Sequence, residues 1–305
     1  MNADLYQTIH ASGAWVDLST RAKWRLSGTD RVRYLNGQVT NDVRNARADT
    51  ALHACVTNVK GRIEGDIYLH TEGESLIFDA PADLRETLGM RLERYIIADD
   101  AVLEDIADEW QLWHHIGGAA GGEPRAESLE YENGRLIKTT RFGLSGYDLW
   151  LPASSALPSD LSPQLPASDA ETFRILQRIP AWPSELNTDT FPQEAGLEKT
   201  TISYTKGCYI GQEILSRIKT TGKMPRELIA WETEDAAEVT AGSHLHLGER
   251  DIGVITSVAR HPVTGRCVGL GYIRQGSAGA DSVLLVEGEM SSIGPQLKIS
   301  ALLNQ

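Results

Sequence analysis

Residues 206–213, "KGCYIGQE", combine side chains and backbone freedom that a purely structural segment rarely needs together. The run holds a lysine, a cysteine, a tyrosine, an amide, a carboxylate and two glycines. Three kinds of chemistry suit this mixture: a reactive thiol, a loop that cradles phosphate, and the wall of a ligand site. The spacing differs from the G-x-x-x-x-G-K-[ST] pattern of a phosphate loop, so that interpretation is the weakest of the three.

Cys208 is the candidate nucleophile of this segment. Isoleucines recur at every fourth residue after it and a glycine follows, which predicts a helix over about residues 209–220. Cys208 then lies in the loop that enters the helix, two residues after Lys206. Free backbone N–H groups and a nearby cation favour a thiolate there, and Gly207 lets a ligand approach the backbone. An isolated cysteine is also commonly a small buried hydrophobe, so both interpretations stand.

Metal and disulfide chemistry have weaker support. His244 and His246 place two imidazoles on one face of a strand, but no third ligand is visible, so we predict no metal site. The sparse cysteines predict neither a disulfide framework nor a zinc site, and they cannot supply four thiolates to an iron–sulfur cluster. These cysteines are Cys55, Cys208 and Cys267.

Length and composition are those of an ordinary globular protein. The chain has 305 residues, of which 41% are hydrophobic, which is enough for a large core or for two to three domains. Its apolar runs fall far short of the roughly 18 residues of a transmembrane helix. The N-terminal segment lacks the basic and apolar regions of a signal peptide. We therefore expect a cytoplasmic protein with no membrane association.

The charge of the chain is strongly acidic overall but uneven. A net charge of −13 disfavours direct nucleic-acid binding over most of the surface. Two segments, residues 21–33 and 199–226, are nonetheless basic. These basic islands indicate an anionic ligand or a local docking site. Solvated helix and loop charges explain either island equally well when it is taken alone.

The elements that must position these groups begin with an alternation of strands and short helices. Residues 13–27 are typical of a strand region, and residues 51–81 of a β-meander with tight turns. Residues 29–37 predict a short helix that ends at its glycine. Residues 81–97 predict another helix, because leucines recur there every four residues.

The second half of the chain divides into a linker and a barrel. Residues 117–128 are rich in glycine and predict a surface loop, and residues 152–168 carry four prolines, which predict a linker. A short helix then ends at Pro180. Short strands broken by glycines follow from about residue 225, which is typical of a small antiparallel barrel. We therefore expect a barrel over residues 225–305, distinct from the region of residues 1–224.

"KGCYIGQE" matches the K-G-C-[FY]-x-G-Q-E signature of the YgfZ family of folate-binding proteins, relatives of the T-protein (aminomethyltransferase) of the glycine cleavage system. This signature is highly specific, and looser resemblances run along the chain in the family's order. They are "LNGQVTNDV" (35–43), "NVKGRIEGDI" (58–67), "RFGLSGYDLWLP" (141–152), "RILQRIP" (174–180) and "FPQEAGLE" just before the signature.

The resemblance implies a fold and a role. The fold is α+β, with three domains of the aminomethyltransferase type: two interleaved α+β domains with ferredoxin-like α/β portions over residues 1–224, and a C-terminal antiparallel β-barrel over residues 225–305. The domains surround a central opening that holds tetrahydrofolate or a derivative. The role is that of a folate-dependent factor that supports the assembly or repair of iron–sulfur enzymes, including enzymes that modify tRNA. Partners would be the folate and iron–sulfur enzymes or assembly proteins.

The resemblance also implies which residues form the site. Asp66 aligns with the second carboxylate of the T-protein's hairpin, so Asp66 and Cys208 are the candidate catalytic residues. Tyr209, Gln212 and Glu213 also suit plain structural roles in the core or at a helix start. The expected folate contacts are Lys206, Gly207, Tyr209, Gln212, Glu213, Asn41, Gln177 and Arg217.

The chain departs from the T-protein at three of these motifs. Gly65–Asp66 replaces a pair of acids, and Leu144 stands where the T-protein has a tyrosine. Leu176 or Gln177 stands where a glutamate holds the pterin ring. A carboxylate holds the pterin N–H groups with charge-assisted bonds, and an amide binds them less strongly. The resemblance therefore favours folate binding over full glycine-cleavage chemistry.

Three functions compete. The leading hypothesis is a folate-binding accessory protein for iron–sulfur enzymes. The second is a tetrahydrofolate-dependent aminomethyl or methyl transferase, with Asp66 as general acid/base and Cys208 as an accessory or acceptor. The third is a non-catalytic docking module for iron–sulfur assembly proteins. The sequence leaves open whether the protein is an enzyme.

Overall fold

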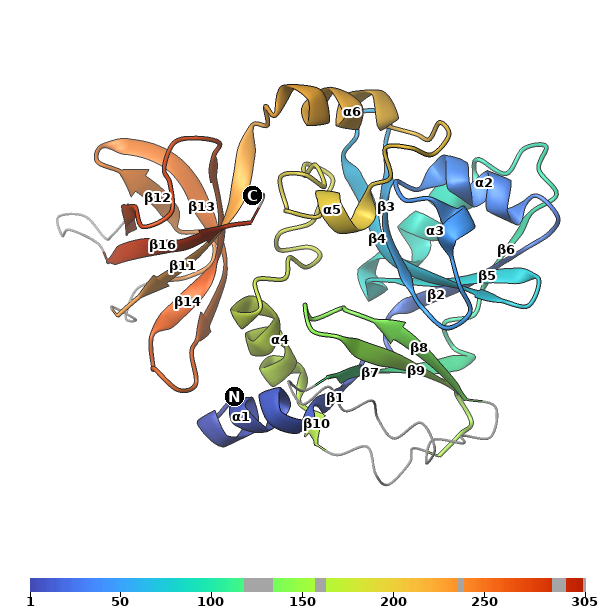
Figure 1. Cartoon of the computed structure of the whole chain (residues 1–305), viewed down its shortest axis with the longest axis horizontal. Coiled ribbons are helices and arrows are strands. Elements are labelled where there is room, and N and C mark those ends of the chain that lie inside the picture. The colour runs from blue at the N-terminus through green and yellow to red at the C-terminus, as the bar shows by residue number, and fades with distance from the viewer. Residues whose placement is uncertain (118–133, 157–162, 235–238, 287–294, 304–305) are drawn as a thin grey trace.

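The computed structural model describes residues 1–117, 134–156, 163–234, 239–286 and 295–303. Most of the predicted glycine-rich loop lies outside these ranges. The described strands form two five-stranded sheets and one closed barrel. In Figure 1 the two sheets lie on the right, the barrel lies on the left, and helices and irregular segments fill the space between them.

The first sheet has the strand order β3-β4-β5-β2-β6. Strands β3, β4 and β5 pair antiparallel in sequence order, which confirms the predicted meander. Its strands are β2 (Ala22–Ser27), β3 (Leu52–Thr57), β4 (Ile63–Glu72), β5 (Ser75–Ala80) and β6 (Val102–Asp105). One face packs beneath helices α2 (Arg31–Gln38) and α3 (Arg85–Glu93), where Leu88 and Leu92 of the predicted leucine repeat are buried.

The predicted helices exist, with shifted ends. α2 continues through Gly37 to Gln38, because the next N–H, that of Val39, still bonds the Leu35 carbonyl. The helix predicted over residues 81–97 is shorter and is preceded by a 3-10 turn. The remaining helices are α1 (Ala3–Ser12), η1 (Val43–Asn45), η2 (Ala82–Leu84), α4 (Ala167–Leu176), α5 (Glu198–Thr201) and α6 (Gln212–Thr221).

The second sheet has the strand order β10-β1-β7-β9-β8. Its strands are β1 (Ala14–Asp17), β7 (Trp110–Ile116), β8 (Arg135–Thr139), β9 (Gly146–Pro152) and β10 (Gln164–Leu165). β10 pairs parallel with β1, so the end of the predicted linker is an edge strand rather than a loop. α1 and α4 cover this sheet through a core that contains Ile9, Ile116 and Phe173.

A buried charged cluster joins the two sheets. Arg141 bonds Asp79 on β5 at 2.5 Å and Asp148 on β9 at 2.6 Å, and His114 bonds Asp148 at 2.9 Å. Burial disfavours the charge on Asp148, but Arg141 and His114 outweigh it and lower the pKa of Asp148 to about 2. A buried ion pair of this kind fixes geometry, because removing one partner leaves an uncompensated charge.

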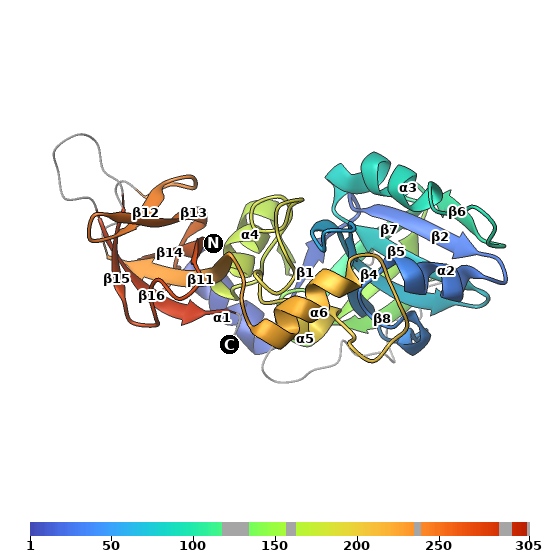
Figure 2. The same cartoon turned by 90° about the horizontal axis from the view of Figure 1, so that it is seen from above.

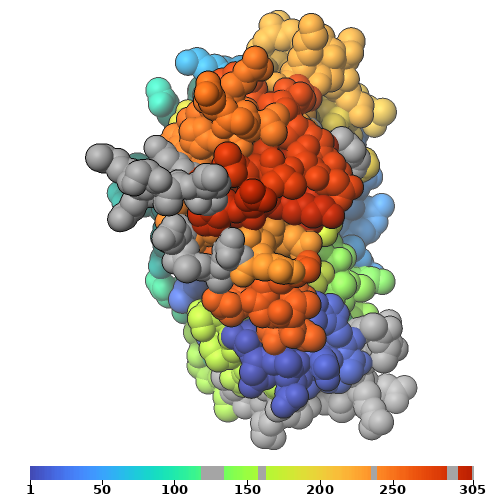
Figure 3. Space-filling view, turned by 90° about the vertical axis from the view of Figure 1, so that its left-hand side faces the viewer, coloured from blue at the N-terminus to red at the C-terminus, as the bar shows by residue number. Residues whose placement is uncertain are grey.

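The C-terminal region is a closed six-stranded barrel, as predicted. Its strands are β11 (Arg226–Thr233), β12 (His244–Leu247), β13 (Arg250–Arg260), β14 (Cys267–Arg274), β15 (Val283–Val286) and β16 (Gln296–Leu302). Trp231 fills the interior against Gly269, where a β-carbon would lie 2.3 Å from the indole. Figure 3 shows that α1 lies beside the barrel surface, and a Tyr6–His261 ring contact at 5.4 Å joins the two.

Candidate ligand site

The signature segment is a loop that is anchored to the first sheet region by Lys206. The Lys206 ammonium donates to the carbonyl oxygens of Asn36, Val39 and Asn41 at 2.7, 2.8 and 2.6 Å. These bonds engage all three of its N–H groups. Lys206 is 6% exposed, and burial lowers its pKa to about 7. Lys206 therefore positions the loop, and its expected contact with a folate stays a prediction.

A second anchor follows Cys208. The N–H of Ile210 donates to the Gly37 carbonyl at 3.1 Å, and the Thr57 hydroxyl donates to the Ile210 carbonyl at 2.6 Å. Gly211 has φ +88°, and a β-carbon there would lie 2.6 Å from the Asn58 carbonyl oxygen. Only glycine allows this approach. The signature loop thus packs directly on the hairpin that carries the second resembling motif.

Cys208 lies between these two anchors and is exposed, whereas Cys55 and Cys267 are buried. Burial raises the pKa of both buried thiols. Helix α6 begins at Gln212 with Gly211 as its N-cap, later than the predicted start at residue 209. Cys208 therefore precedes the helix by a full turn, so the argument from a helix N-terminus does not apply to it. Its exposure comes from the loop.

The other signature residues separate into a core residue and a helix surface. Tyr209 is 7% exposed and packs in a core beneath α6, although its hydroxyl has no hydrogen-bond partner within the described ranges. Burial, with Cys55 nearby, raises its pKa to about 12. Gln212 and Glu213 form the first turn of α6, and Arg217 is exposed further along it. Figures 1 and 2 show α6 between the first sheet and the barrel.

Asp66 lies on β4 opposite Cys55 and forms a pair with His53. His53 Nε2 donates to Asp66 Oδ1 at 2.5 Å, and the two side chains are 16% and 14% exposed. Burial alone would raise the pKa of Asp66, but His53, with Arg21 and Arg141 at longer range, lowers it. Asp66 is consequently a carboxylate at neutral pH.

Asn41 connects the signature anchor to this pair. Its side-chain amide donates to the carbonyl oxygens of His53 at 2.9 Å and Thr200 at 3.1 Å, while its own carbonyl accepts from Lys206. The structure thus brings Asn41, Lys206 and Asp66 into one bonded network. The amide of Asn41 serves the chain rather than standing free for a ligand.

Gln177 comes from another part of the fold. It is the half-buried C-cap of α4, and its β-carbon lies 3.9 Å from the point where a β-carbon on Gly143 would be. The next residue, Arg178, has φ +61°, which turns the chain sharply out of the helix. None of the described bonds connects Gln177 to the signature loop.

Most charges of the basic islands are already paired. In the first island Arg21, Arg25 and Arg33 pair with acidic side chains, and Lys23 is buried on backbone carbonyls. In the second, Lys219 pairs with Glu198 and Arg226 with Glu194. The islands therefore give less support to an anionic ligand than their composition indicates. Arg217 and Lys223 have no side-chain partner in the described part of the chain.

A second place that could hold a ligand lies outside the signature loop. A groove of about 940 Å³ runs along α3, and Val59, Met90, Trp182 and Arg94 contribute to its lining. We call it the α3 groove. Val59 and Met90 are 72% and 55% exposed. It offers a second place for a ligand, and its residues serve below as controls for the site at Asp66.

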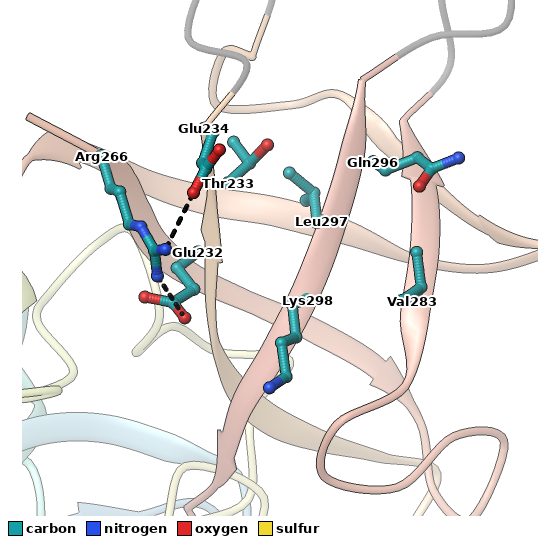
Figure 4. Close-up of a pocket in the computed structure, with 8 residues that line it drawn as sticks. All are labelled: Glu232, Thr233, Glu234, Arg266, Val283, Gln296, Leu297 and Lys298. Atoms are coloured by element: carbon teal, nitrogen blue, oxygen red, sulfur yellow. Dashed lines mark hydrogen bonds and ion pairs between the residues drawn. The ribbon is translucent and has the colours of Figure 1, made fainter.

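A smaller hollow of about 380 Å³ lies on the barrel (Figure 4). At one side of it Arg266 bonds Glu232 at 3.2 Å and Glu234 at 2.8 Å, and Lys298 pairs with Asp281. Its charges satisfy one another, so it has no evident group for a ligand.

The described residues also bear on metal binding and on membrane spans. They contain no group of three or more His, Cys, Asp or Glu side chains placed to hold a metal ion. No helix within the described ranges is long and apolar enough to cross a membrane.

His53 is the site residue that sequence reasoning missed. It precedes the hairpin motif, and its own neighbours in the sequence are ordinary strand residues. Only the register of β3 against β4 places it on the same face as Asp66, two pairs along the ladder. A signal existed in the two-residue spacing of His53 and Cys55, because residues two apart on a strand share a face and Cys55 pairs with the candidate acid Asp66.

Comparisons with known proteins agree with the motifs. No protein-family model matches the sequence. A protein of Serratia proteamaculans named tRNA-modifying protein YgfZ is 29% identical, over 80% of this chain and 80% of its own. One of that name from Yersinia pestis (strain Pestoides F) is 27% identical, over 91% and 90%. A Rubrobacter xylanophilus aminomethyltransferase is 24% identical, over 92% and 82%.

A solved structure confirms the fold. The chain resembles the glycine cleavage system aminomethyltransferase T from Bartonella henselae with a TM-score of 0.84, over 99% of this chain and 89% of that one, at 16% identity. The predicted resemblance to YgfZ proteins and aminomethyltransferases is therefore confirmed over most of the chain, and the aminomethyltransferase-like fold with its C-terminal barrel is confirmed as well.

Proposed function

We propose that this protein binds tetrahydrofolate or a derivative in the opening beside the signature loop. Its role would be to support the assembly or repair of iron–sulfur enzymes, including tRNA-modifying ones, in the cytoplasm. The observation that carries the proposal is the signature loop, which is pinned on both sides of an exposed Cys208. Relatives named tRNA-modifying protein YgfZ, aligned over four fifths of the chain or more, support the role.

The electrostatics at Asp66 favour binding over acid catalysis. Because its pKa is lowered, Asp66 is ionised at neutral pH and has no proton to give. A carboxylate is instead suited to accept hydrogen bonds from the N–H groups of a pterin ring. This argues against Asp66 as a general acid in a one-carbon transferase.

The transferase remains a second candidate, since a relative named aminomethyltransferase aligns with 92% of this chain. Incubating the protein with tetrahydrofolate and an aminomethyl or methyl donor tests it. Formation of a one-carbon folate at a rate proportional to protein concentration would establish the transferase. No turnover together with folate binding would favour the accessory protein.

Calorimetric titration with tetrahydrofolate under reducing conditions tests the leading proposal. We expect saturable binding, tighter for folates with longer polyglutamate tails and weaker with added salt. Arg94→Ala in the α3 groove should leave the affinity unchanged, whereas Asp66→Asn should weaken it. No saturation up to millimolar ligand would reject the proposal and favour the non-catalytic docking module. If Arg94→Ala lowers the folate affinity and Asp66→Asn does not, the ligand binds in the α3 groove.

Cellular rescue tests the iron–sulfur role separately. Cys208→Ala should stay folded and bind folate, but it should fail to support the activity of iron–sulfur enzymes in cells that lack the protein. Cys267→Ala, which alters a buried barrel thiol, is the control. If the Cys208 variant supports the iron–sulfur enzymes normally, the signature has only a structural role.

A further inference from the structure

Asp66 presents one engaged and one free oxygen. Oδ1 accepts from His53 Nε2 at 2.5 Å, and Oδ2 forms no hydrogen bond within the residues that the structure describes. The side chain is 14% exposed, so solvent or a ligand can reach it. β3 and β4, which carry the pair, run beside α5 at the inner side of the first sheet region (Figure 1). Because His53 holds one oxygen of the carboxylate, the other oxygen is oriented as a hydrogen-bond acceptor.

The imidazole that holds Asp66 is itself fixed. Its ring stacks on Tyr68 with the centroids 4.2 Å apart and the planes 6° from parallel. The Arg141 guanidinium lies 4.1 Å from the centroid of the same tyrosine ring. The backbone carbonyl of His53 accepts from Asn41. Stacking and backbone bonds leave the imidazole little freedom to turn.

We propose that His53 is a positioning residue of the folate site, which orients Asp66 so that its free oxygen accepts a hydrogen bond from an N–H group of the pterin ring. The inference rests on the proposed function and names the part of the ligand that Asp66 recognises. The ligand class is a reduced pterin, whose ring amino and N–H groups are donors. His53 acts through Asp66 and does not touch the ligand.

The other charged groups around the pair do not replace His53. Arg141 is engaged by Asp79 and Asp148, and Arg21 pairs with Asp79. On β3 and β4 the neighbouring titratable groups are Cys55 and Tyr68, both neutral at physiological pH because burial raises their pKa. None of these groups bonds Asp66. Without His53 the carboxylate would lose the one hydrogen-bond partner that it has among the described residues, and it would be free to rotate.

The experiment compares two substitutions of His53 by calorimetric titration with tetrahydrofolate. Glutamine keeps an Nε2 donor without the imidazole ring, whereas leucine removes the donor. We expect His53→Gln to stay within about threefold of the wild-type affinity and His53→Leu to weaken it about tenfold or more, the loss of a charge-assisted bond. Thermal unfolding of both variants reports whether they are folded.

The barrel supplies a matched control. His244 Nδ1 lies 2.8 Å from Asp251 Oδ2, in a histidine–aspartate pair in which both side chains are 51% exposed. His244→Leu should leave the folate affinity unchanged. Rescue by glutamine at residue 53 distinguishes positioning from bulk packing, because a packing role would not depend on the Nε2 donor.

The outcomes separate this inference from the proposed function. If wild type binds tetrahydrofolate and His53→Leu binds equally well, His53 is not a positioning residue and the function stands. If wild type does not bind, the proposed function fails. Nitrogen-15 imidazole spectra of the free protein then test the pair alone. A slowly exchanging His53 Nε2–H signal that disappears in Asp66→Leu would support orientation of Asp66, and its absence in wild type would overturn the inference.

Discussion

Lys206 shows how a conspicuous signature residue can serve the chain rather than a ligand. Its ammonium is buried and bonds three carbonyl oxygens at the end of α2 and just beyond it. The stretch after α2 forms an isolated bridge to β3 through Val39 and Val56, and the lysine supplies a hydrogen-bond donor to each of the three carbonyls. Lys206 therefore fixes the position of the loop that carries Cys208.

We expect Lys206→Met to lower the free energy of unfolding by about 3 kcal/mol or more, because one buried and two part-buried carbonyl groups lose their donor. Lys223→Met is the control, since Lys223 is exposed, and it should change stability by less than about 0.5 kcal/mol. Urea titration measures both. Equal, small effects would show that the three carbonyls find other partners and that the anchor is dispensable.

Cys208 is the thiol that a reagent can reach. With Cys55 and Cys267 buried, and the pKa of each raised by burial, we expect one fast and two slow phases with an aromatic disulfide near neutral pH. Cys208→Ser should remove only the fast phase. Three slow phases in the wild-type protein would mean that the loop covers this thiol in solution.

At the scale of elements, the contact between the signature loop and the 58–62 hairpin depends on glycine. Gly211→Ala should cost about 2–4 kcal/mol, since it combines a left-handed backbone with overlap against Asn58. Gly207 has ordinary backbone geometry and no heavy atom within 4 Å of a β-carbon. Gly207→Ala should therefore leave stability within about 0.5 kcal/mol of wild type.

Urea unfolding and folate titration of these two variants distinguish a glycine that the fold requires from a glycine that lets the ligand approach the backbone. A stable Gly207→Ala protein with weaker folate binding would mean that the ligand comes close to this backbone, as the resemblance implies. Unchanged binding would remove Gly207 from the site. A Gly211→Ala protein as stable as wild type would contradict the packing of the loop on the hairpin.

Elements with strong periodicity were predictable from the sequence. The leucine repeat of α3, the meander β3–β5 and the glycine-punctuated barrel all follow from local patterns. The start of α6 was predicted three residues early, because the isoleucine spacing extends into a loop that Gly211 closes with a left-handed turn. Strand β10 was missed because two residues carry no period, and only its pairing with β1 defines it.

The candidate site was predictable only in part. The signature sequence identified the loop and its exposed thiol, and the hairpin motif identified Asp66. The partners of Lys206 and of the basic islands were not predictable, because they are backbone carbonyls and acids distant in the sequence. The expected folate contacts stay predictions until a folate-bound structure tests them; they are Lys206, Gly207, Tyr209, Gln212, Glu213, Asn41, Gln177 and Arg217.

At the scale of the whole molecule, arginines from three of the resembling motifs connect the parts. Arg62 bonds Glu194 beside the start of the barrel, Arg141 connects the two sheets, and Arg174 bonds Glu185 at 3.0 Å and Ser257 of the barrel at 3.0 Å. Each of these motifs therefore supplies an arginine that connects two parts of the fold. The division into residues 1–224 and 225–305 stays a proposal, because these contacts tie α4 to the barrel.

The cluster around Arg141 makes a prediction about acid stability. The pKa of Asp148, about 2, is below its ordinary value of 3.8, so its ionised form is bound more favourably in the folded state than in the unfolded chain. A carboxyl group whose pKa is lowered by folding stabilises the folded state fully at pH values above its ordinary pKa. It loses that contribution as pH falls through the lower pKa of the folded state. The two sheets should therefore lose part of their connection between about pH 4 and pH 2.

Asp148→Asn isolates this contribution. At neutral pH the variant should be less stable by about 3–5 kcal/mol, because Arg141 keeps only the Asp79 carboxylate and a buried charge is left partly uncompensated. As pH falls from about 4 to 2, wild type loses the Asp148 contribution and the variant has none to lose, so the gap should narrow. Urea unfolding at pH 7, 4 and 2.5 measures the gap, with the exposed Asp251→Asn as control. A gap that stays constant across this range would mean that Asp148 titrates at its ordinary value, and that packing rather than the ion pair holds the two sheets together.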